Sequence, residues 1–294
     1  MKIEIHDVGH GGCAVVTCPN GSRIMLDCGF DANRDWFPSV VYSGQCIDVL
    51  VITNLDEDHV EDLPYVCDRV TLGSIYSNPT VTAAALAAMK REHGMDEGVR
   101  KAHAILSRFG PGHVGEMADL GEVRAWGYSN RYGLDFIDTN NLSVATFVRW
   151  GAFTILFAGD LETAGWRALL RNSAFVADLA TVTVFVASHH GRANGRCEEV
   201  FKIVRPEIVV FSDDRKQHES QETDAWYRQR VSGIPMLDAV PSSIIPKKRH
   251  VYTTRRDGTL TIQVERTGRY VATPTRADPP PAFGLLGLLS PPTA

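Results

Sequence analysis

Acidic side chains and a histidine crowd into residues 54–59, which read Asn-Leu-Asp-Glu-Asp-His. Asn54, Asp56 and Asp58 alternate along this segment, and His59 follows directly. Carboxylate, amide and imidazole groups at this spacing in a turn can surround one cation with several donors. A solvated acidic loop is the simpler interpretation, but it explains neither the histidine nor the apolar run that precedes the segment. The segment therefore predicts a divalent-metal site.

Two later segments carry further candidate ligands. Asp160 ends the run FTILFAGD, although a Gly-Asp pair after a strand is by itself typical of a plain turn. His189 and His190 stand side by side before a glycine. Adjacent histidines in a tight bend suit one metal ligand and its neighbour. The sequence leaves open which of the two is the ligand.

Each of these segments closes an apolar run rich in Val and Ile. Such runs, bounded by Gly, Asp or Asn, are typical of buried strands. The chain has five of them, at residues 23–29, 47–59, 153–160, 182–191 and 208–214. Donor groups at several strand ends indicate one site at one edge of a sheet. The pattern favours a metal-dependent hydrolase.

Helical periodicity fills the stretches between the strands. Apolar residues recur at helical spacing across residues 80–109, where Gly94 and Gly98 divide the pattern in two. Residues 162–172, 198–204 and 222–231 predict further helices, and residues 247–265 predict a last hairpin that turns at Asp257-Gly258. This order predicts an α/β protein in which two sheets pack face to face with helices outside, an αββα four-layer sandwich.

Composition agrees with a folded enzyme. The chain has 294 residues, 44% of them apolar, and a net charge of −5, so it has no global attraction to nucleic acid or to an anionic membrane. No apolar stretch is long enough to span a bilayer and no signal peptide is visible, so we expect a cytoplasmic protein without a membrane partner. The six cysteines form no C-x-x-C pair and are expected to be reduced core residues.

The C-terminal residues have a different composition. From about residue 272 the chain becomes rich in proline, which has no N–H to donate to a sheet. We therefore expect a hydrolase domain at residues 1–271 with a helical insertion at about 80–110. Residues 272–294 are expected to be a dispensable tail, either a mobile end or a segment that docks a partner protein.

Taken in order, these motifs resemble the metallo-β-lactamase superfamily, and within it the hydrolase domain of ComEC-type competence proteins. The resemblance runs from about residue 3 to about residue 268. It is carried by DVGHGG at 7–12, LDCG at 26–29, TNLDEDH at 53–59, NNLSV at 140–144, FAGDLE at 157–162, SHHG at 188–191 and YTTRRDGTLTI at 252–262. The resemblance implies the αββα metallo-β-lactamase fold with one or two metal ions at the sheet edge.

Mapped residue by residue, the resemblance implies distinct roles. Asp58 and His59 would bind one metal, Asp160 would bridge, and His189 or His190 would add a ligand. Asn54 and Asp56 stand where the first ligands of the other metal lie. Four further residues would hydrogen-bond the metal ligands and orient them without binding the metal: Asp7, Asp27, Asn140 and Asn141.

The sequence also departs from the family pattern. Asn54 replaces the usual first histidine, and His10 and Gly12 replace a Gln and an Asp of the early glycine-rich loop. Asn140 or Asn141 stands where many members have another histidine. A set this rich in oxygen favours Mn²⁺ or Mg²⁺, with Zn²⁺ a possible alternative, as one ion or two.

The expected chemistry is attack by a metal-activated water. Asp58 is the candidate to orient or deprotonate that water, and His10 or His218 could protonate the leaving group. The resemblance implies cleavage of DNA phosphodiesters. A basic group in the predicted hairpin could contact the nucleic acid, although a solvated hairpin face explains it equally well: Lys247, Lys248, Arg249, Arg255 and Arg256.

Two other function classes fit the same residues. One is a hydrolase of a small substrate such as a cyclic nucleotide, a lactam or a thioester, with residues 80–109 as a lid over a closed pocket. The other is a non-catalytic relative that uses the fold for binding and has a degraded metal site, an interpretation that Asn54 supports.

Overall fold

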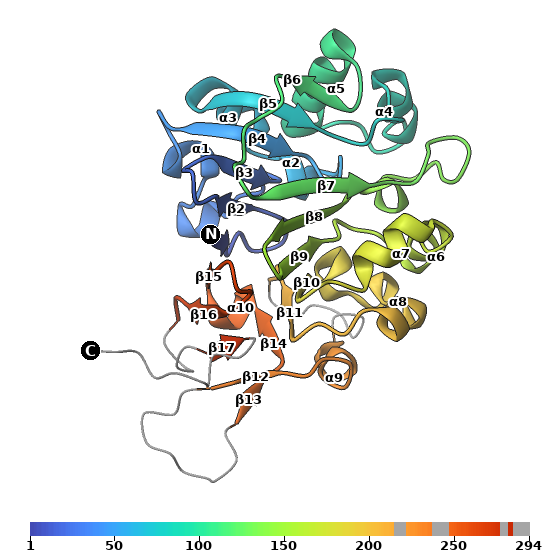
Figure 1. Cartoon of the computed structure of the whole chain (residues 1–294). Helices are drawn as coiled ribbons and strands as arrows, with labels where there is room; N and C mark the ends of the chain where they lie inside the picture. The colour runs from blue at the N-terminus through green and yellow to red at the C-terminus, as the bar shows by residue number, and fades with distance from the viewer. Residues whose placement is uncertain (215–221, 237–246, 277–281, 285–294) are drawn as a thin grey trace.

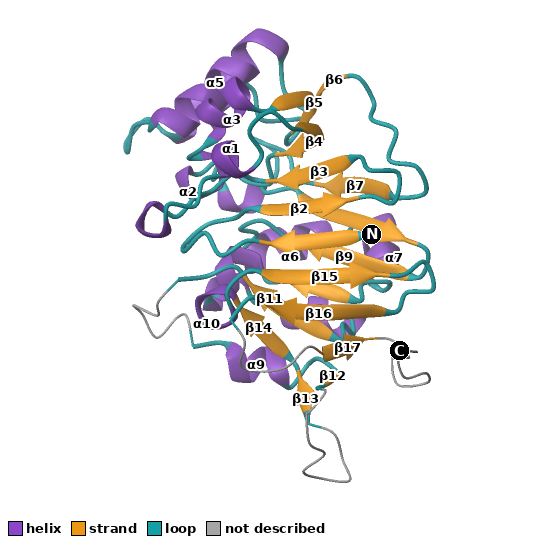
Figure 2. Ribbon diagram, turned by 90° about the vertical axis from the view of Figure 1, so that its left-hand side faces the viewer, coloured by secondary structure: helices purple, strands orange, loops and turns teal. Residues whose placement is uncertain are grey.

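The computed structural model describes residues 1–214, 222–236, 247–276 and 282–284. Two large sheets pack face to face, and helices cover their outer faces (Figures 1 and 2). Buried hydrophobic residues form three clusters, one between the sheets and one between each sheet and its helices. Four layers with three apolar interfaces make an αββα sandwich, the architecture of the metallo-β-lactamase fold, so the predicted fold is confirmed.

The first sheet has nine strands in the order β17-β16-β15-β1-β2-β3-β4-β5-β6. Strands β3, β4 and β5 pair in parallel and the other neighbours are antiparallel. Their bounds are β1 Lys2–Ile5, β2 Ala14–Thr17, β3 Arg23–Leu26, β4 Cys46–Val51, β5 Thr71–Tyr76, β6 His113–Gly115, β15 Leu260–Val264, β16 Tyr270–Pro274 and β17 Ala282–Gly284.

The second sheet has six strands in the order β14-β11-β10-β9-β8-β7. Strands β9, β10, β11 and β14 run parallel, so their carboxyl ends lie at the same edge. The bounds are β7 Arg124–Tyr128, β8 Ala145–Trp150, β9 Phe153–Phe157, β10 Val184–Val186, β11 Ile208–Phe211 and β14 Val251–Thr253. A small separate ladder joins β12 Ile234–Pro235 to β13 Lys248–Arg249.

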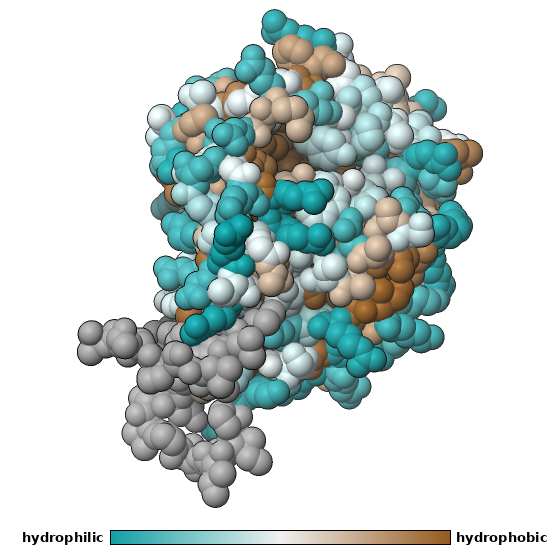
Figure 3. Space-filling view, in the orientation of Figure 1, coloured by the Kyte–Doolittle hydropathy of each residue, from teal (hydrophilic) through white to brown (hydrophobic). Residues whose placement is uncertain are grey.

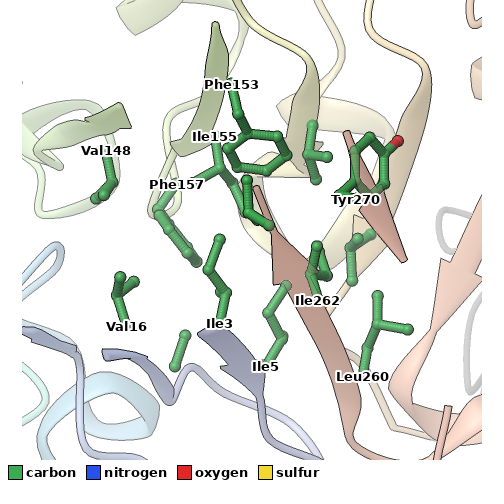
Figure 4. Packing of buried hydrophobic residues seen from close by; sticks show 14 of the residues in the cluster. Ile3, Ile5, Val16, Val148, Phe153, Ile155, Phe157, Leu260, Ile262 and Tyr270 are labelled. Atoms are coloured by element: carbon green, nitrogen blue, oxygen red, sulfur yellow. The ribbon is translucent and has the colours of Figure 1, made fainter. Parts of the chain in front are cut away.

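Alternate residues of both sheets meet in the core between them. Ile3 and Ile5 of β1 face Phe153 and Ile155 of β9 in Figure 4, with Ile262 beside them. All these side chains are buried. Because side chains of a strand alternate between its two faces, this register turns the intervening residues of the first sheet toward the outer helices.

Eight helices supply the outer layers within the described residues. Four cover the first sheet: α1 Pro38–Val41, α3 Leu63–Arg69, α4 Ala83–Met89 and α5 Glu97–Phe109. Four cover the second: α6 Thr163–Leu169, α7 Ser173–Leu179, α8 Glu198–Ile203 and α9 Asp224–Arg228. Thr82 and Asp96 cap α4 and α5, and Gly94 lies between them with φ 80°. The predicted break of the 80–109 stretch into two helices is thus confirmed at Gly94, whereas Gly98 lies buried inside α5 and does not interrupt it.

The predicted hairpin at residues 247–265 is wrong. Strand β14 joins the second sheet and β15 joins the first, and the short helix α10 Thr254–Asp257 connects them. The Asp257 carboxylate is buried, accepts a hydrogen bond from the Thr253 backbone N–H at 2.8 Å and pairs with Arg249 at 2.6 Å. Gly258, at φ 71°, therefore ends a helical turn instead of closing a hairpin.

The boundary expected after residue 271 falls inside β16, which pairs with β15 along all five of its residues. Ala272 is buried, and Arg276 bonds Asp7 at 2.6 Å and the Arg255 carbonyl at 2.6 Å. Strand β17 extends the same sheet despite the prolines around it. The remaining residues of the expected tail lie outside the described part of the chain.

Ending the chain after residue 271 should therefore destabilise the domain. A chain that ends after residue 276 keeps the contacts of Ala272 and Arg276 and serves as the matched control. We expect the shorter chain to melt at least about 5 °C below the longer one, as measured by circular dichroism. Equal melting temperatures would show that residues 272–276 contribute nothing to the fold.

No helix in the described part of the chain is long and apolar enough to cross a bilayer. Hydrophilic residues spread over the face shown in Figure 3, and hydrophobic ones form separate small groups there. All six cysteines are free, and four of them are buried.

Candidate metal centre

The segment that follows β4 turns at once into the short helix α2 Glu57–Val60. Asp58 and His59 are consecutive residues of α2, and backbone hydrogen bonds from two neighbouring segments fix their positions. The Asp58 carbonyl accepts a hydrogen bond from Gly12 at 3.2 Å, and the His59 carbonyl accepts one from Cys28 at 2.9 Å. The glycine-rich loop and the end of β3 thus position both side chains.

Glycine is required where this loop meets α2. A Cβ built on Gly11 would lie 2.3 Å from the Asp58 carbonyl oxygen, and one on Gly29 would lie 2.5 Å from the same atom. Both distances are shorter than any real Cβ contact, so neither position accepts a larger residue without displacing Asp58. The motifs DVGHGG and LDCG therefore act as a support for α2.

Four donor side chains from three strand ends converge at the sheet edge. Asp58, His59, Asp160 and His190 each offer one ligand atom, and these atoms lie within 4.8 Å of one another. His59 Nε2 is 3.1 Å from Asp160 Oδ1, and His190 Nε2 is 3.1 Å from Asp58 Oδ2 and 3.4 Å from Asp160 Oδ1. Of the two adjacent histidines, His190 is the one that enters this cluster.

His59 is oriented by a buried carboxylate. Its Nδ1 lies 2.8 Å from Asp27 Oδ2, and Asp27 also accepts from the Thr53 N–H at 2.6 Å and the Thr53 hydroxyl at 2.5 Å. A carboxylate at Nδ1 selects the tautomer in which Nε2 is free to bind a metal. The structure places Asp27 where the resemblance implied an orienting role.

His190 is oriented by the backbone. Its Nδ1 lies 2.8 Å from the carbonyl oxygen of Ser212, which again leaves Nε2 directed at the cluster. His189 and His190 both have left-handed backbone conformations, with φ of 50° and 54°, and Gly191 follows with φ 80°. Such conformations cost on the order of 1–3 kcal/mol each in a non-glycine residue and gather at functional sites.

Asp160 sits at the end of β9 after a left-handed glycine. Gly159 has φ 54°, and a Cβ there would lie 2.8 Å from the Ser143 Cβ. The Asp160 N–H donates to the Ser143 hydroxyl at 3.0 Å. The Gly-Asp pair therefore does more than form a turn: it directs a buried carboxylate toward both imidazoles.

The carboxylates of the cluster favour positive charge on the imidazoles of His59 and His190. Burial lowers the pKa of His59, but the carboxylates of Asp160, Asp27 and Asp58 outweigh it and raise that pKa well above its usual value. The pKa of His190 is raised to about 10 because Asp160 and Asp58 outweigh burial there too. Burial also opposes ionisation of Asp58 and Asp160, yet the imidazoles hold both carboxyl pKa values below the usual one.

The same atoms fit a metal ion. His59 Nε2, Asp160 Oδ1 and His190 Nε2 are buried and have no hydrogen-bond partner among the described residues. These three residues line a cavity of about 40 Å³, room for a cation and a few waters. Buried ligand atoms that converge on one small space without hydrogen bonds are what a metal site requires. Two carboxylates and two imidazoles suit several divalent ions, and this set has fewer oxygens than the sequence predicted.

The two predicted ligands of a second ion have other partners. Asp56 Oδ1 is 2.5 Å from Lys90 Nζ, and Asp56 Oδ2 accepts from the Thr139 hydroxyl at 2.7 Å. The Asn54 amide donates to Asn140 Oδ1 at 3.3 Å and accepts from the Asp56 N–H at 3.1 Å. Asn54 and Asp56 thus form a hydrogen-bonded group beside the four-residue cluster.

The other residues expected to orient ligands divide into two groups. Asn140 bridges Asn54 to Glu162, whose Oε1 is 3.4 Å from the Asn140 amide. Asn141 instead caps α6, since its side-chain oxygen accepts from the Gly165 N–H at 2.8 Å. Asp7 bonds Arg34 at 2.5 Å and Arg276 at 2.6 Å, so it ties the C-terminal strand region to the N-terminal loop.

The mouth of the site is formed by Asp58, His10 and Arg192. Asp58 is the most exposed of the four cluster residues, and its Oδ2 is 3.4 Å from His10 Nε2. Burial, His190 and Arg192 together lower the pKa of His10 to about 4, in spite of Asp58, so its ring is neutral at pH 7. A neutral ring accepts or donates a hydrogen bond but carries no spare proton for a leaving group. His218, the other candidate acid, lies outside the described residues.

Arg192 was missed in the sequence. Its guanidinium lies 3.3 Å from His10 Nε2 and 3.4 Å from His189 Nε2. No carboxylate in the described part of the chain pairs with it, and its buried Nε has no hydrogen-bond partner there. Its place directly after SHHG was the available signal. His189, which lies 3.7 Å from Glu162, belongs to this rim and not to the cluster.

Most of the predicted nucleic-acid contacts are tied to carboxylates. Arg249 and Arg256 pair with Asp257 at 2.6 and 3.2 Å, and Arg255 pairs with Asp213 and Asp224. Only the two lysines, Lys247 and Lys248, are exposed and without a carboxylate partner among the described residues. The hairpin does not exist, but Lys247, Lys248, Arg249 and Arg256 line one hollow together with Arg228, and Arg255 is not among its lining residues.

Comparisons with known proteins find similarity only among solved structures. No protein-family model and no curated protein matches the chain. A mutant of the β-hydroxylase CmlA matches at 14% identity and TM-score 0.49, over 90% of this chain and 54% of that one. CmlA itself, a diiron β-hydroxylase from Streptomyces venezuelae, matches at 17% identity and TM-score 0.46, over 78% of this chain and 50% of that one. A diphosphatase of the PhnP family matches at 10% identity and TM-score 0.43, over 90% and 98%. The chain thus spans about half the length of the CmlA chains.

Proposed function

We propose that this protein is a metal-dependent hydrolase that cleaves phosphodiesters, with DNA as the leading substrate. The observation that carries the proposal is the convergence of three buried atoms beside the Asp58 carboxylate: His59 Nε2 and His190 Nε2 lie 3.1 and 3.4 Å from Asp160 Oδ1, yet none of the three has a hydrogen-bond partner among the described residues. A cation held among these atoms would take up the ligand positions that their mutual ion pairs leave without a hydrogen bond.

The residues of the site would have different roles in the reaction. Asp58, His59, Asp160 and His190 would hold the cation, which when bound lowers the pKa of water towards about 7 and stabilises charge on a phosphoryl oxygen. Asp58, at the mouth, is placed to orient or deprotonate the attacking water. Asp160 is buried and lies 3.1 and 3.4 Å from the Nε2 atoms of His59 and His190, whose rings are oriented by Asp27 and by the Ser212 carbonyl.

Arg192 supports an anionic substrate. Its guanidinium stands at the mouth without a carboxylate partner among the described residues, and it contacts two imidazoles. Guanidinium groups bind phosphate through paired, charge-assisted hydrogen bonds. A phosphodiester oxygen would satisfy these donors, whereas a neutral lactam would not.

The size of the cavity supports a substrate that approaches from outside. The cavity of about 40 Å³ behind His59, Asp160 and His190 is far below the roughly 300 Å³ or more that encloses an organic ligand, and neither Asp58 nor Arg192 lines it. A polymer backbone can present one phosphodiester to the partly exposed Asp58 and His10 while the rest of it lies on the surface. The choice of DNA among phosphodiesters rests on the resemblance to ComEC-type domains.

The test is a substrate screen with the metal-loaded protein. Plasmid DNA, single-stranded DNA, RNA, bis(p-nitrophenyl) phosphate, a chromogenic lactam and a thioester are offered with Mn²⁺, Mg²⁺ or Zn²⁺, and Asp160→Asn controls for contaminating nuclease. We expect DNA and the aryl phosphodiester to be cleaved, and because two carboxylates and two imidazoles suit several divalent ions, the screen decides which ion supports the highest rate. Intact nucleic acids with a hydrolysed lactam or thioester would replace this proposal by the small-substrate one, and no hydrolysis at all would favour a binding protein.

A further inference from the structure

A lysine holds the position beside the cluster where the sequence predicted a second cation. Lys90 Nζ lies 2.5 Å from Asp56 Oδ1, and only 13% of the Lys90 side chain is exposed. The other Asp56 oxygen accepts the Thr139 hydroxyl at 2.7 Å. Both oxygens of this carboxylate are therefore engaged within the protein.

Asn54 is likewise turned away from a ligand role. Its side-chain oxygen, the atom that would bind a metal, accepts the Asp56 N–H at 3.1 Å. Its amide nitrogen donates to Asn140 Oδ1 at 3.3 Å, which places N–H groups and not lone pairs on that side. Asn54 is buried, so these bonds set the direction of the amide.

The lysine comes from the helical stretch 80–109. Lys90 is the C-cap of α4, and its backbone N–H bonds the Leu86 carbonyl at 3.0 Å. Leu86 is fully buried in the cluster that packs α4 on the first sheet. The packing of α4 on the first sheet thus positions the Lys90 ammonium beside Asp56, although the two residues are 34 positions apart in the sequence.

We propose that the Lys90 ammonium takes the place of a second metal ion, so that the protein binds one cation per chain. A fixed positive charge within hydrogen-bond distance of Asp56 neutralises the carboxylate and repels a divalent ion. This inference rests on the proposed function, because it takes the four-residue cluster as the site of the single ion.

The experiment counts metal ions in the purified full-length chain. Wild type, Asn54→His, Lys90→Met and the double variant Asn54→His/Lys90→Met are equilibrated with Mn²⁺ or Zn²⁺. Bound metal is measured by elemental analysis and by native mass spectrometry. Lys90→Arg, which keeps the charge, is the matched control, and circular dichroism reports whether each variant is folded.

We expect one ion in wild type, in Asn54→His and in Lys90→Arg, and a second ion in the double variant. The second ion should bind Asn54→His at least about tenfold more weakly than the double variant, since only the former keeps the ammonium. Two ions in wild type, or a double variant that still binds one, would overturn the role of Lys90. A wild type without any ion would instead refute the proposed function, so the two failures are distinguishable.

Discussion

Replacing His190 by alanine is expected to remove the bound cation, whereas the same change at His189 should leave it in place. His190 Nε2 lies within 3.1–3.4 Å of two cluster carboxylates, whereas the His189 ring nitrogens lie 3.7 Å from Glu162 and 3.4 Å from Arg192. Loss of a direct ligand should weaken metal affinity by more than about 100-fold, because loss of an orienting partner alone costs about 10–100-fold. Isothermal titration calorimetry with Mn²⁺ or Zn²⁺ measures the difference.

The two variants form a matched pair. Both residues are buried and both have left-handed backbone, so alanine introduces similar strain at each position. A general loss of stability would then appear in both. Equal metal affinity of the two variants, or selective loss in His189→Ala, would contradict the assignment of His190.

Replacing Asp27 by asparagine should weaken metal binding although it changes none of the four residues proposed to bind the metal. Asp27 accepts three hydrogen bonds, from His59 Nδ1 and from the N–H and hydroxyl of Thr53. An amide turns one acceptor into a donor, which releases the His59 ring. We expect metal affinity to fall by about 10–100-fold and the free energy of unfolding to fall by about 1–3 kcal/mol. Asparagine tolerates the φ of 59° at this position, so the backbone is not the cause.

Asp62→Asn separates orientation of the ligand from stability. Asp62 is as buried as Asp27, and its two oxygens accept the N–H and the hydroxyl of Ser39 at 2.7 and 3.1 Å. Its loss should lower the free energy of unfolding by a comparable amount but leave metal affinity unchanged. If both variants bind metal equally well, Asp27 is only a structural carboxylate.

Local pattern was enough to predict much of the fold. The five apolar runs correspond to β3, β4, β9, β10 and β11, because buried strands need Val and Ile irrespective of their neighbours. The helix break near Gly94 was predicted for the same reason, since backbone preference is local. The hairpin at 247–265 was predicted wrongly because an Asp-Gly pair ends a helical turn as readily as it closes a hairpin. Here the hydrogen bond from the Thr253 N–H and the ion pair with Arg249 hold Asp257 in the helical turn.

By itself, the sequence determined the segments that carry the site: α2 after β4, Asp160 after β9, and the histidine pair after β10. Their residue types sit at strand ends, and parallel strands bring those ends to one edge. Only the tertiary structure decided which histidine enters, that Lys90 engages Asp56, and that Arg192 stands at the mouth. These outcomes depend on distances between side chains far apart in the chain, or on backbone direction at single residues. Neither is set by local periodicity, because both arise only when the layers pack.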